Sequence, residues 1–287
     1  ATLDRATGAV TSLVDLATGK ESIRSGGSAG RLERHFEQPV GMSAWVLGKI
    51  ERFDALKPLS STARVEGGLA KVTFAYLLED PARPGTESKV EQTFTLRPGE
   101  SQVDCEVRVD WRVLGGNNLP TPMLRLANDA NASTDSALYE IPFGSISRPA
   151  DGAEVVGLQW AAITDAQGGL ALLNDSKHGY SATKGTLRLS LIRSSYDPDP
   201  NPNPGPHAWR YALVPQSAPA RPDQLSRLAV GFTTPLISAT VPFDAKGKNP
   251  LEWSAAKVGR EGIVPTVHKR AEDGGYLVRF FQATNQP

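Results

Sequence analysis

A polar segment that follows an apolar run holds the densest mixture of chemically useful side chains in the sequence. The apolar run covers residues 169–173, and the segment after it, residues 174–180, reads Asn-Asp-Ser-Lys-His-Gly-Tyr. Amide, carboxylate and cationic groups can bridge pairs of hydroxyls, and an aromatic ring can lie against the CH face of a sugar, so this mixture suits a neutral hexose. A polar turn capped by Asn174 and Gly179 explains the same residues equally well.

Other candidate residues are scattered along the chain. Arg193 ends an apolar run at residues 187–192 and is either a site residue or a strand-end charge. No two histidines lie within four residues of each other, so a zinc site would have to be assembled from distant segments, and structural roles are favoured. The four histidines are His35, His178, His207 and His268.

A proline-rich segment at residues 197–206 carries Asp and Asn at alternate positions, as in the first half of a calcium-binding loop. The match fails further on, because Pro202 and Ala208 stand where such a loop requires Gly and Glu. The segment is therefore expected to be a semi-rigid extended loop. The serine-hydrolase elbow, the phosphate-binding loop and the dinucleotide-binding glycine motif do not occur in the sequence.

The overall composition restricts the partners. The 287 residues carry 31 basic and 31 acidic side chains, whereas binding to nucleic acid or to an anionic membrane would require a basic excess. No apolar run reaches the roughly 18 residues of a membrane-spanning helix. The single Cys105 leaves reducing and oxidising compartments open, and we expect a soluble protein with the cytoplasm favoured. The chain begins at Ala1 rather than Met, so we expect a processed or partial protein.

The elements that must position these residues are expected to be mostly strands, because apolar and polar side chains alternate along much of the sequence. From Val103 to Val113 apolar side chains alternate with polar or charged ones without interruption, which predicts a half-buried strand. The ranges 72–76, 90–96, 187–191 and 277–281 show similar patterns, with Gly- and Pro-rich turn signals between them. No stretch of 12 or more residues free of Gly and Pro has a convincing helical period. The sequence therefore predicts an all-β chain of stacked antiparallel sheets in one large sandwich.

Four motifs follow one another from residue 139 onward. They are YEIPFGSISRP at 139–149, GLALLNDSKHGY at 169–180, LSLIR at 189–193 and GPH at 205–207. In this order they resemble the carboxyl-terminal β region of family 38 α-mannosidases. The flanking segments GMSAW at 41–45 and KRAEDGGYLVRF at 269–280 agree with it, so the resemblance runs from about residue 3 to about residue 282.

The resemblance implies a fold for this chain, and it also implies that the catalytic groups of the family are absent from it. Family members are retaining enzymes in which one carboxylate is the nucleophile, a second carboxyl group is the acid and base, and a zinc ion binds sugar hydroxyls. These groups belong to an amino-terminal α/β barrel, which no segment of this sequence resembles. We therefore expect residues 1–287 to form one large antiparallel super-sandwich of the galactose-mutarotase-like type. Catalytic residues, metal and cofactor are expected to be absent from this chain, with zinc in the missing barrel.

The resemblance also implies where this region acts. In the intact enzyme it packs on the barrel and adds loops to the rim of the active site. The expected partners are a mannose-containing carbohydrate and the amino-terminal catalytic region of the same enzyme, and the chain alone is expected to be inactive. The residues expected at the rim are Arg193, His178, Tyr180 and His207, and those expected to buttress them are Asn174, Asp175 and Lys177.

Two other functions stay open. A sugar mutarotase or epimerase needs a general acid and a general base on either side of a pyranose. His178 or His207 could supply one, and Asp175 or Glu140 the other. A stand-alone carbohydrate-binding module would instead need aromatic platforms, although tryptophans in apolar strands are more commonly core residues. The candidate platforms are Trp45, Trp160, Trp209 and Trp253.

Overall fold

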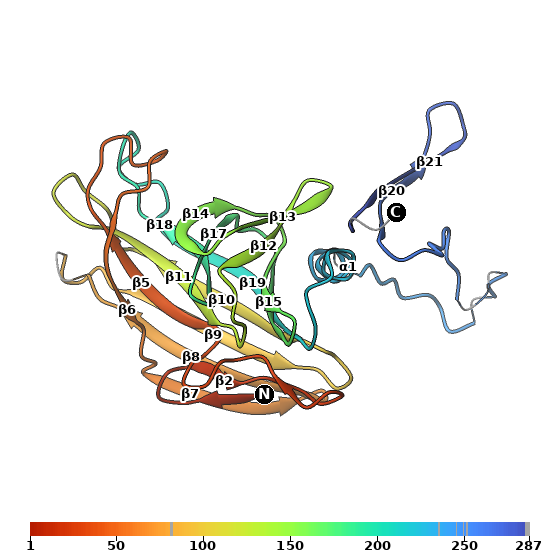
Figure 1. Cartoon of the computed structure of the whole chain (residues 1–287), viewed down its shortest axis with the longest axis horizontal. Coiled ribbons are helices and arrows are strands. Elements are labelled where there is room, and N and C mark those ends of the chain that lie inside the picture. The colour runs from red at the N-terminus through yellow and green to blue at the C-terminus, as the bar shows by residue number, and fades with distance from the viewer. Residues whose placement is uncertain (81–82, 235, 245, 249, 251, 285–287) are drawn as a thin grey trace.

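The computed structural model describes residues 1–80, 83–234, 236–244, 246–248, 250 and 252–284, and most regular elements in these ranges are β-strands (Figure 1). Nine of the described strands form one antiparallel sheet in the order β13-β12-β15-β16-β19-β10-β9-β8-β7. Their bounds are β7 Ser60–Glu66, β8 Leu69–Leu78, β9 Ser88–Leu96, β10 Val103–Trp111, β12 Ser136–Ile141, β13 Gly144–Pro149, β15 Trp160–Asp165, β16 Gly168–Asn174 and β19 Gly205–Gln216.

A second antiparallel sheet contains six of the described strands in the order β14-β17-β18-β11-β5-β6. Their bounds are β5 Arg31–Glu37, β6 Ile50–Ala55, β11 Thr121–Asp129, β14 Asp151–Val156, β17 Gly179–Thr183 and β18 Thr186–Arg193. Three two-stranded pairs complete the described strands. They are β1 Thr2–Asp4 with β2 Ala9–Ser12, β3 Val14–Asp15 with β4 Lys20–Glu21, and the hairpin β20 Ile263–Arg270 with β21 Tyr276–Gln282.

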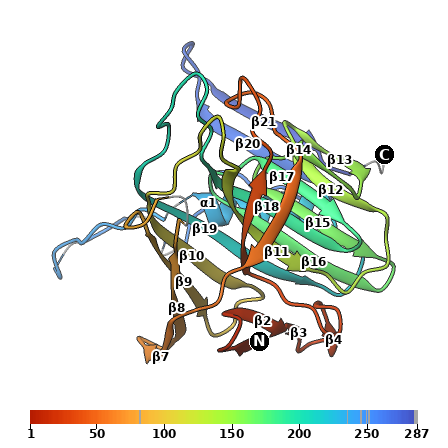
Figure 2. The ribbon, with the colours of Figure 1, turned by 90° about the vertical axis from the view of Figure 1, so that its left-hand side faces the viewer.

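The two large sheets face each other across one hydrophobic core (Figures 1 and 2). In β10 the alternate side chains from Val103 to Trp111 are buried in this core, which confirms the strand predicted from their period of two. Leu124 and Leu126 of β11 enter the same core from the opposite sheet. The other predicted strand ranges are confirmed within β8, β9, β18 and β21.

One helix, α1 (Pro222–Thr233), departs from the all-β prediction. Leu225 and Ala229 pack against the outer face of the nine-stranded sheet, next to Trp160 of β15. The sequence did not predict this helix, because the helix contains Pro222 and Gly231, which the helical pattern required to be absent. Proline is tolerated in the first turn of a helix, where its missing N–H has no intrahelical partner to lose. The described residues include no helix that is long and apolar enough to cross a membrane.

A buried hydrogen bond joins α1 to the sheet. The Trp160 indole Nε1 donates to Ser226 Oγ over 3.0 Å. Ser226→Ala would remove this acceptor and leave only the nearby Glu140 carboxyl group for the indole N–H, so we expect it to lower the free energy of unfolding by about 1 kcal/mol, measured by urea denaturation. In a Trp160→Phe background the N–H is absent and the same substitution should cost less, whereas an equal cost in both backgrounds would contradict this role.

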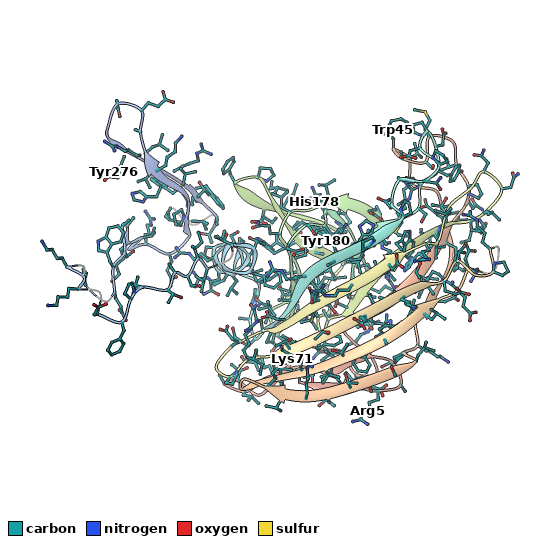
Figure 3. All side chains as sticks on the ribbon, turned by 180° about the vertical axis from the view of Figure 1, so that it is seen from behind. Arg5, Trp45, Lys71, His178, Tyr180 and Tyr276 are labelled. Carbon is teal, nitrogen blue, oxygen red and sulfur yellow. The ribbon has the colours of Figure 1, made fainter. Side chains whose placement is uncertain are left out.

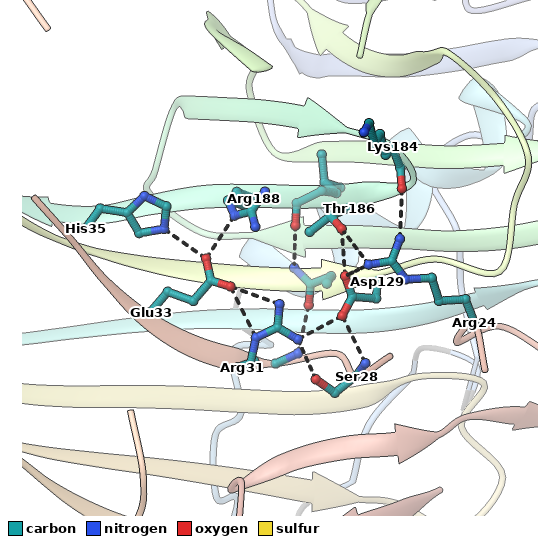
Figure 4. A network of polar contacts seen from close by, with 12 residues as sticks. Arg24, Ser28, Arg31, Glu33, His35, Asp129, Lys184, Thr186 and Arg188 are labelled. Atoms are coloured by element: carbon teal, nitrogen blue, oxygen red, sulfur yellow. Dashed lines mark hydrogen bonds and ion pairs between the residues drawn. The ribbon is translucent and has the colours of Figure 1, made fainter. Parts of the chain in front are cut away.

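A buried polar network crosses the outer face of the six-stranded sheet (Figure 4). The Glu33 carboxylate accepts hydrogen bonds from Arg31 Nη2, Arg188 Nε and His35 Nε2, over 2.9, 2.9 and 2.8 Å. Asp129 continues the network, because it accepts hydrogen bonds from Arg31, Arg24 and Thr186. These contacts join β5, β11 and β18, so the face opposite the apolar core is held together by charge.

The pKa values of Glu33 and His35 in this network are both lowered. Burial alone would raise the pKa of Glu33, but the hydrogen bonds from His35 and Arg188 and the charge of the arginines outweigh it and lower the pKa to about 2. Burial lowers the pKa of His35 below its ordinary value, against the opposing effect of Glu33. His35 is therefore neutral near pH 7, and its Nε2–H donates to Glu33.

Acidification is expected to destabilise the protein from near neutrality downward. Below about pH 6.5 the unfolded chain takes up a proton at His35 before the folded chain does, and Glu33 behaves likewise from about pH 4.5 down to about 2. Denaturant titrations between about pH 7 and pH 5 should therefore show a falling free energy of unfolding. His35→Gln should reduce this slope and His268→Gln, at an exposed position, should not. A slope independent of His35 would contradict the assignment.

Candidate functional site

The residues selected from the sequence lie along one edge of the two sheets. Asn174 ends β16 and pairs with Tyr211 of its antiparallel neighbour β19, which also contains His207. Arg193 ends β18, and Tyr180 of the neighbouring β17 pairs with Leu189 of the same strand. Figure 3 shows His178 at this upper edge and the exposed Trp45 farther along it, away from Arg5 and Lys71. The antiparallel pairing thus brings together residues that the sequence places far apart.

The Asn174 side chain organises the connection between β16 and β17. Its Oδ1 accepts hydrogen bonds from the backbone N–H groups of Ser176 and Lys177, over 3.0 and 2.6 Å. Its Nδ2 donates to the Leu158 carbonyl and to the Tyr180 hydroxyl. Tyr180 is 0% exposed and donates its O–H to the same carbonyl, and burial raises the pKa of its phenol. Within this chain Asn174 and Tyr180 are therefore buried side chains that shape the turn.

His178, next in this turn, is exposed and its ring has a fixed orientation. The ring Nδ1 lies 3.2 Å from the Gly157 carbonyl oxygen, which makes Nδ1–H the donor in the neutral imidazole. Nε2 is then an acceptor. A group that meets His178 at this edge would therefore find a hydrogen-bond acceptor on a ring that is held by the backbone.

The charged residues of the turn are paired with residues of β19. Asp175 accepts a hydrogen bond from Arg210 Nε over 3.2 Å. The Lys177 Nζ lies 4.5 Å from the centroid of the Trp209 ring, and burial lowers the pKa of this lysine. His207 stacks on Trp209 with ring centroids 5.7 Å apart. The strand β19 thus carries a layer of rings under the turn.

Arg193 is fully engaged within the chain. Its Nε and Nη2 donate to the Glu37 carboxylate, which is 0% exposed, in a bidentate ion pair. Its Nη1 donates to the Ser43 carbonyl and its Nη2 to the Val46 carbonyl. The structure therefore places Arg193 at the base of residues 38–49, which we term the arginine-held loop, and this guanidinium fixes the backbone of that loop.

The arginine-held loop is also tied to the proline-rich segment. The Ser43 Oγ accepts hydrogen bonds from the backbone N–H groups of Tyr196 and Asp197, each over 2.9 Å. The Met42 N–H donates to the Asp197 carboxylate, although Met42 has a φ of 56°, which a side chain other than Gly rarely adopts. The loop exposes a cluster of apolar side chains, with Trp45 at 68% exposure. Its members are Met42, Trp45, Val46 and Leu47.

A cavity of about 430 Å³ opens beside the turn, between the β12–β13 hairpin, α1 and the hairpin β20–β21. Burial raises the pKa of Glu140 in its wall, against hydrogen bonds that lower it. Of the acid and base candidates considered for a mutarotase, His207 does not line the cavity, whereas Glu140, Asp175 and His178 do. The full lining is Glu140, Ile141, Pro142, Phe143, Leu158, Gln159, Asn174, Asp175, Ser176, His178, Ser226, Val230, Val264, Thr266 and Phe281.

Sequence reasoning missed several residues of this edge. Glu37 carried no local signal, because its partner Arg193 is distant in sequence. Phe143 and Phe281 lie in segments with a recognisable pattern, but their contact joins residues far apart in sequence. Of the four tryptophans considered as platforms, Trp160 and Trp209 are buried, whereas Trp45 and Trp253 are exposed. The described residues contain no group of three or more His, Cys, Asp or Glu side chains that could hold a metal ion.

Comparison with known proteins shows which proteins this chain resembles. Alpha-mannosidase G of Dictyostelium discoideum is 29% identical over 290 residues, which cover 96% of this chain and 26% of that protein. Human alpha-mannosidase 2C1 is 29% identical over 294 residues, which cover 96% of this chain and 27% of that protein. A glycosyl hydrolase family 38 protein of Enterococcus faecalis has the same fold, with a TM-score of 0.78 at 15% identity over 95% of this chain and 36% of that one.

The chain thus spans about a quarter of the length of these two α-mannosidase relatives. The family model described as "Glycosyl hydrolases family 38 C-terminal domain" matches residues 1–201, which is more than half of the 287 residues. The ordered motifs, the antiparallel sheets and this match agree. The chain therefore belongs to glycosyl hydrolase family 38 and contains the C-terminal domain of that family.

Proposed function

We propose that this chain is the C-terminal portion of a retaining α-mannosidase, that it packs on the catalytic region of the enzyme, and that its edge at the β16–β17 turn forms part of the active-site rim. The arginine-held loop is the observation that carries the proposal. It displays four apolar side chains on a backbone that is already fixed by Arg193 and Ser43.

Such a loop has the properties of a protein interface. Trp and Met are enriched in interface cores, and a loop that is ordered before contact loses little conformational entropy on binding. In the α-mannosidase relatives, about three quarters of the protein lies outside the region that matches this chain. The catalytic region within that remainder is the proposed partner of the loop, and the zinc ion belongs to it.

The neighbouring turn supplies the proposed rim. His178 is exposed and Lys177 is half-buried, His207 lies beside the Trp209 ring, and Asp175 is oriented by Arg210. Asn174 and Tyr180 buttress the turn from below. The substrate of the rim would be a mannose-containing carbohydrate, whose hydroxyls match these donors and acceptors. Arg193 would act there as a positioning residue, because its nitrogens already serve Glu37 and the loop.

The arrangement of the two large sheets supports a more specific fold type, which is part of this proposal. Two large antiparallel sheets share one core, and the nine-stranded sheet extends well beyond the six-stranded one at β7 and β8 (Figure 1). We assign this arrangement to the super-sandwich of the galactose-mutarotase-like type. A single domain over residues 1–287 is part of the same assignment.

The test uses the catalytic region proposed as the partner, expressed separately. Trp45→Ala should weaken its association with this chain at least tenfold, measured by calorimetry, and should lower the aryl α-mannosidase activity that the mixture recovers with zinc. Trp253→Ala removes an equally exposed tryptophan outside the loop and is the matched control. Turnover of the aryl α-mannoside by this chain alone would overturn the proposal, as would an association that does not depend on Trp45.

A further inference from the structure

The cavity beside the β16–β17 turn has a chemistry of its own. We propose that it binds a single neutral pyranose and that this chain alone forms the site. The cavity shares Asp175 and His178 with the proposed rim, but the inference goes beyond the proposed function, since no catalytic barrel is needed for it. Its volume of about 430 Å³ is in the range of small-molecule pockets and accommodates one sugar ring.

An aromatic pair forms one wall. Phe143 and Phe281 meet edge to face with ring centroids 6.1 Å apart. Phe143 is 58% exposed, so its ring is accessible to a ligand. Aromatic faces of this kind cover the CH groups of a pyranose.

The backbone at Phe143 is strained. Its φ of 60° lies in the left-handed region, where glycine is the normal residue, and the next residue in the β12–β13 turn is Gly144. Strained positions of this kind persist where surrounding structure holds them, and they concentrate at ligand sites. The turn therefore presents an aromatic ring at a position where the backbone alone would favour glycine.

Carboxylates and hydroxyls form the remaining wall. Glu140 Oε2 accepts a hydrogen bond from the Gln159 N–H over 2.7 Å, and Ser226 Oγ donates to Oε1 over 3.4 Å. The Trp160 side chain and backbone also contact this carboxyl group, so Glu140 is a fixed part of the wall. Asp175 is fixed on the other side by Arg210 and by Ser176 Oγ, which donates over 2.9 Å. His178 adds a further ring nitrogen to the same wall.

The charges in the cavity decide between ligand classes. The described residues of its lining include Glu140 and Asp175 but no lysine or arginine, so a phosphate or carboxylate ligand would find no counter-ion among them. A cationic ligand is disfavoured as well, because Arg210 already neutralises Asp175 and the buried Glu140 carboxyl group is engaged by Gln159 and Ser226. A ligand that is neutral, rich in hydroxyls and apolar on one face satisfies both walls.

Saturation-transfer NMR and calorimetry on this chain alone test the inference. The probes are the methyl α-pyranosides of mannose, glucose and galactose. Only the choice of mannose as the first probe rests on the proposed function. Saturable binding with a dissociation constant in the millimolar range is expected for at least one of them. Phe143→Ala should weaken it at least tenfold and His178→Ala several-fold, while the chain stays folded because both side chains are exposed.

Phe280→Ala is the matched control, because Phe280 is 62% exposed on the same hairpin as Phe281 but does not line the cavity. It should leave the affinity unchanged. The inference is overturned if no pyranoside binds, if Phe143→Ala binds as well as the unaltered chain, or if tetramethylammonium binds more tightly than every pyranoside in a way that depends on Phe143. None of these results affects the proposed function, which is tested at Trp45.

Discussion

Replacing Glu33 by alanine is expected to lower the free energy of unfolding by about 3–5 kcal/mol, because it removes the acceptor at the centre of a buried network. Glu33 is 0% exposed and its carboxylate serves Arg31, Arg188 and His35. The substitution leaves the Arg188 guanidinium, itself mostly buried, without its carboxylate. A charge that loses its partner away from water costs far more than the pair contributed when it was intact.

Chemical denaturation at pH 7 measures this effect, and the exposed pair Arg52–Asp54 in the same sheet provides the comparison. Asp54→Ala breaks an ion pair whose side chains are each about half exposed, so it should cost less than about 1 kcal/mol. Glu33→Gln keeps one acceptor oxygen but removes the charge and should fall between the two variants. A Glu33→Ala variant as stable as Asp54→Ala would show that the network does not hold β5 to β18.

Arg193→Ala is expected to cost a similar amount, about 3–5 kcal/mol, and also to release the arginine-held loop. The Glu37 carboxylate is fully buried and would lose its bidentate partner, while the carbonyls of Ser43 and Val46 would lose their donor. Arg193→Lys keeps the charge but has no planar fork for Glu37 and the loop at once, so it should recover only part of the loss.

Release of the arginine-held loop can be measured separately from a global loss of stability. Backbone amides of residues 38–49 should exchange with solvent faster in Arg193→Lys under conditions where the core strands keep their protection. In the mixture with the catalytic region, the same variant should raise the KM for the aryl α-mannoside more than it lowers kcat, as expected of a positioning residue. Unchanged exchange in the loop would contradict this role for Arg193.

Some features of the molecule were already determined by local sequence. The strand β10 follows from the strict alternation between Val103 and Trp111, since a period of two fixes which side chains enter the core. The turn after β16 follows from Asn174, whose short amide caps the nearby backbone N–H groups. The ordered motifs by themselves indicate the family, because they preserve residue type and order over almost the whole chain.

Tertiary structure alone decided the rest, because the deciding contacts join residues that are far apart in sequence. Glu37 and Arg193 are 156 residues apart, and Glu33 and Arg188 are 155 apart, so no local pattern indicates either pair. The helix α1 depends on the apolar outer face of β15, β16 and β19, which compensates for its proline and glycine. The cavity exists only where the β12–β13 turn, α1 and the last hairpin converge. Sequence thus specified the strands and the family, whereas the packing of distant segments determined which of its polar residues are buried supports and which remain exposed.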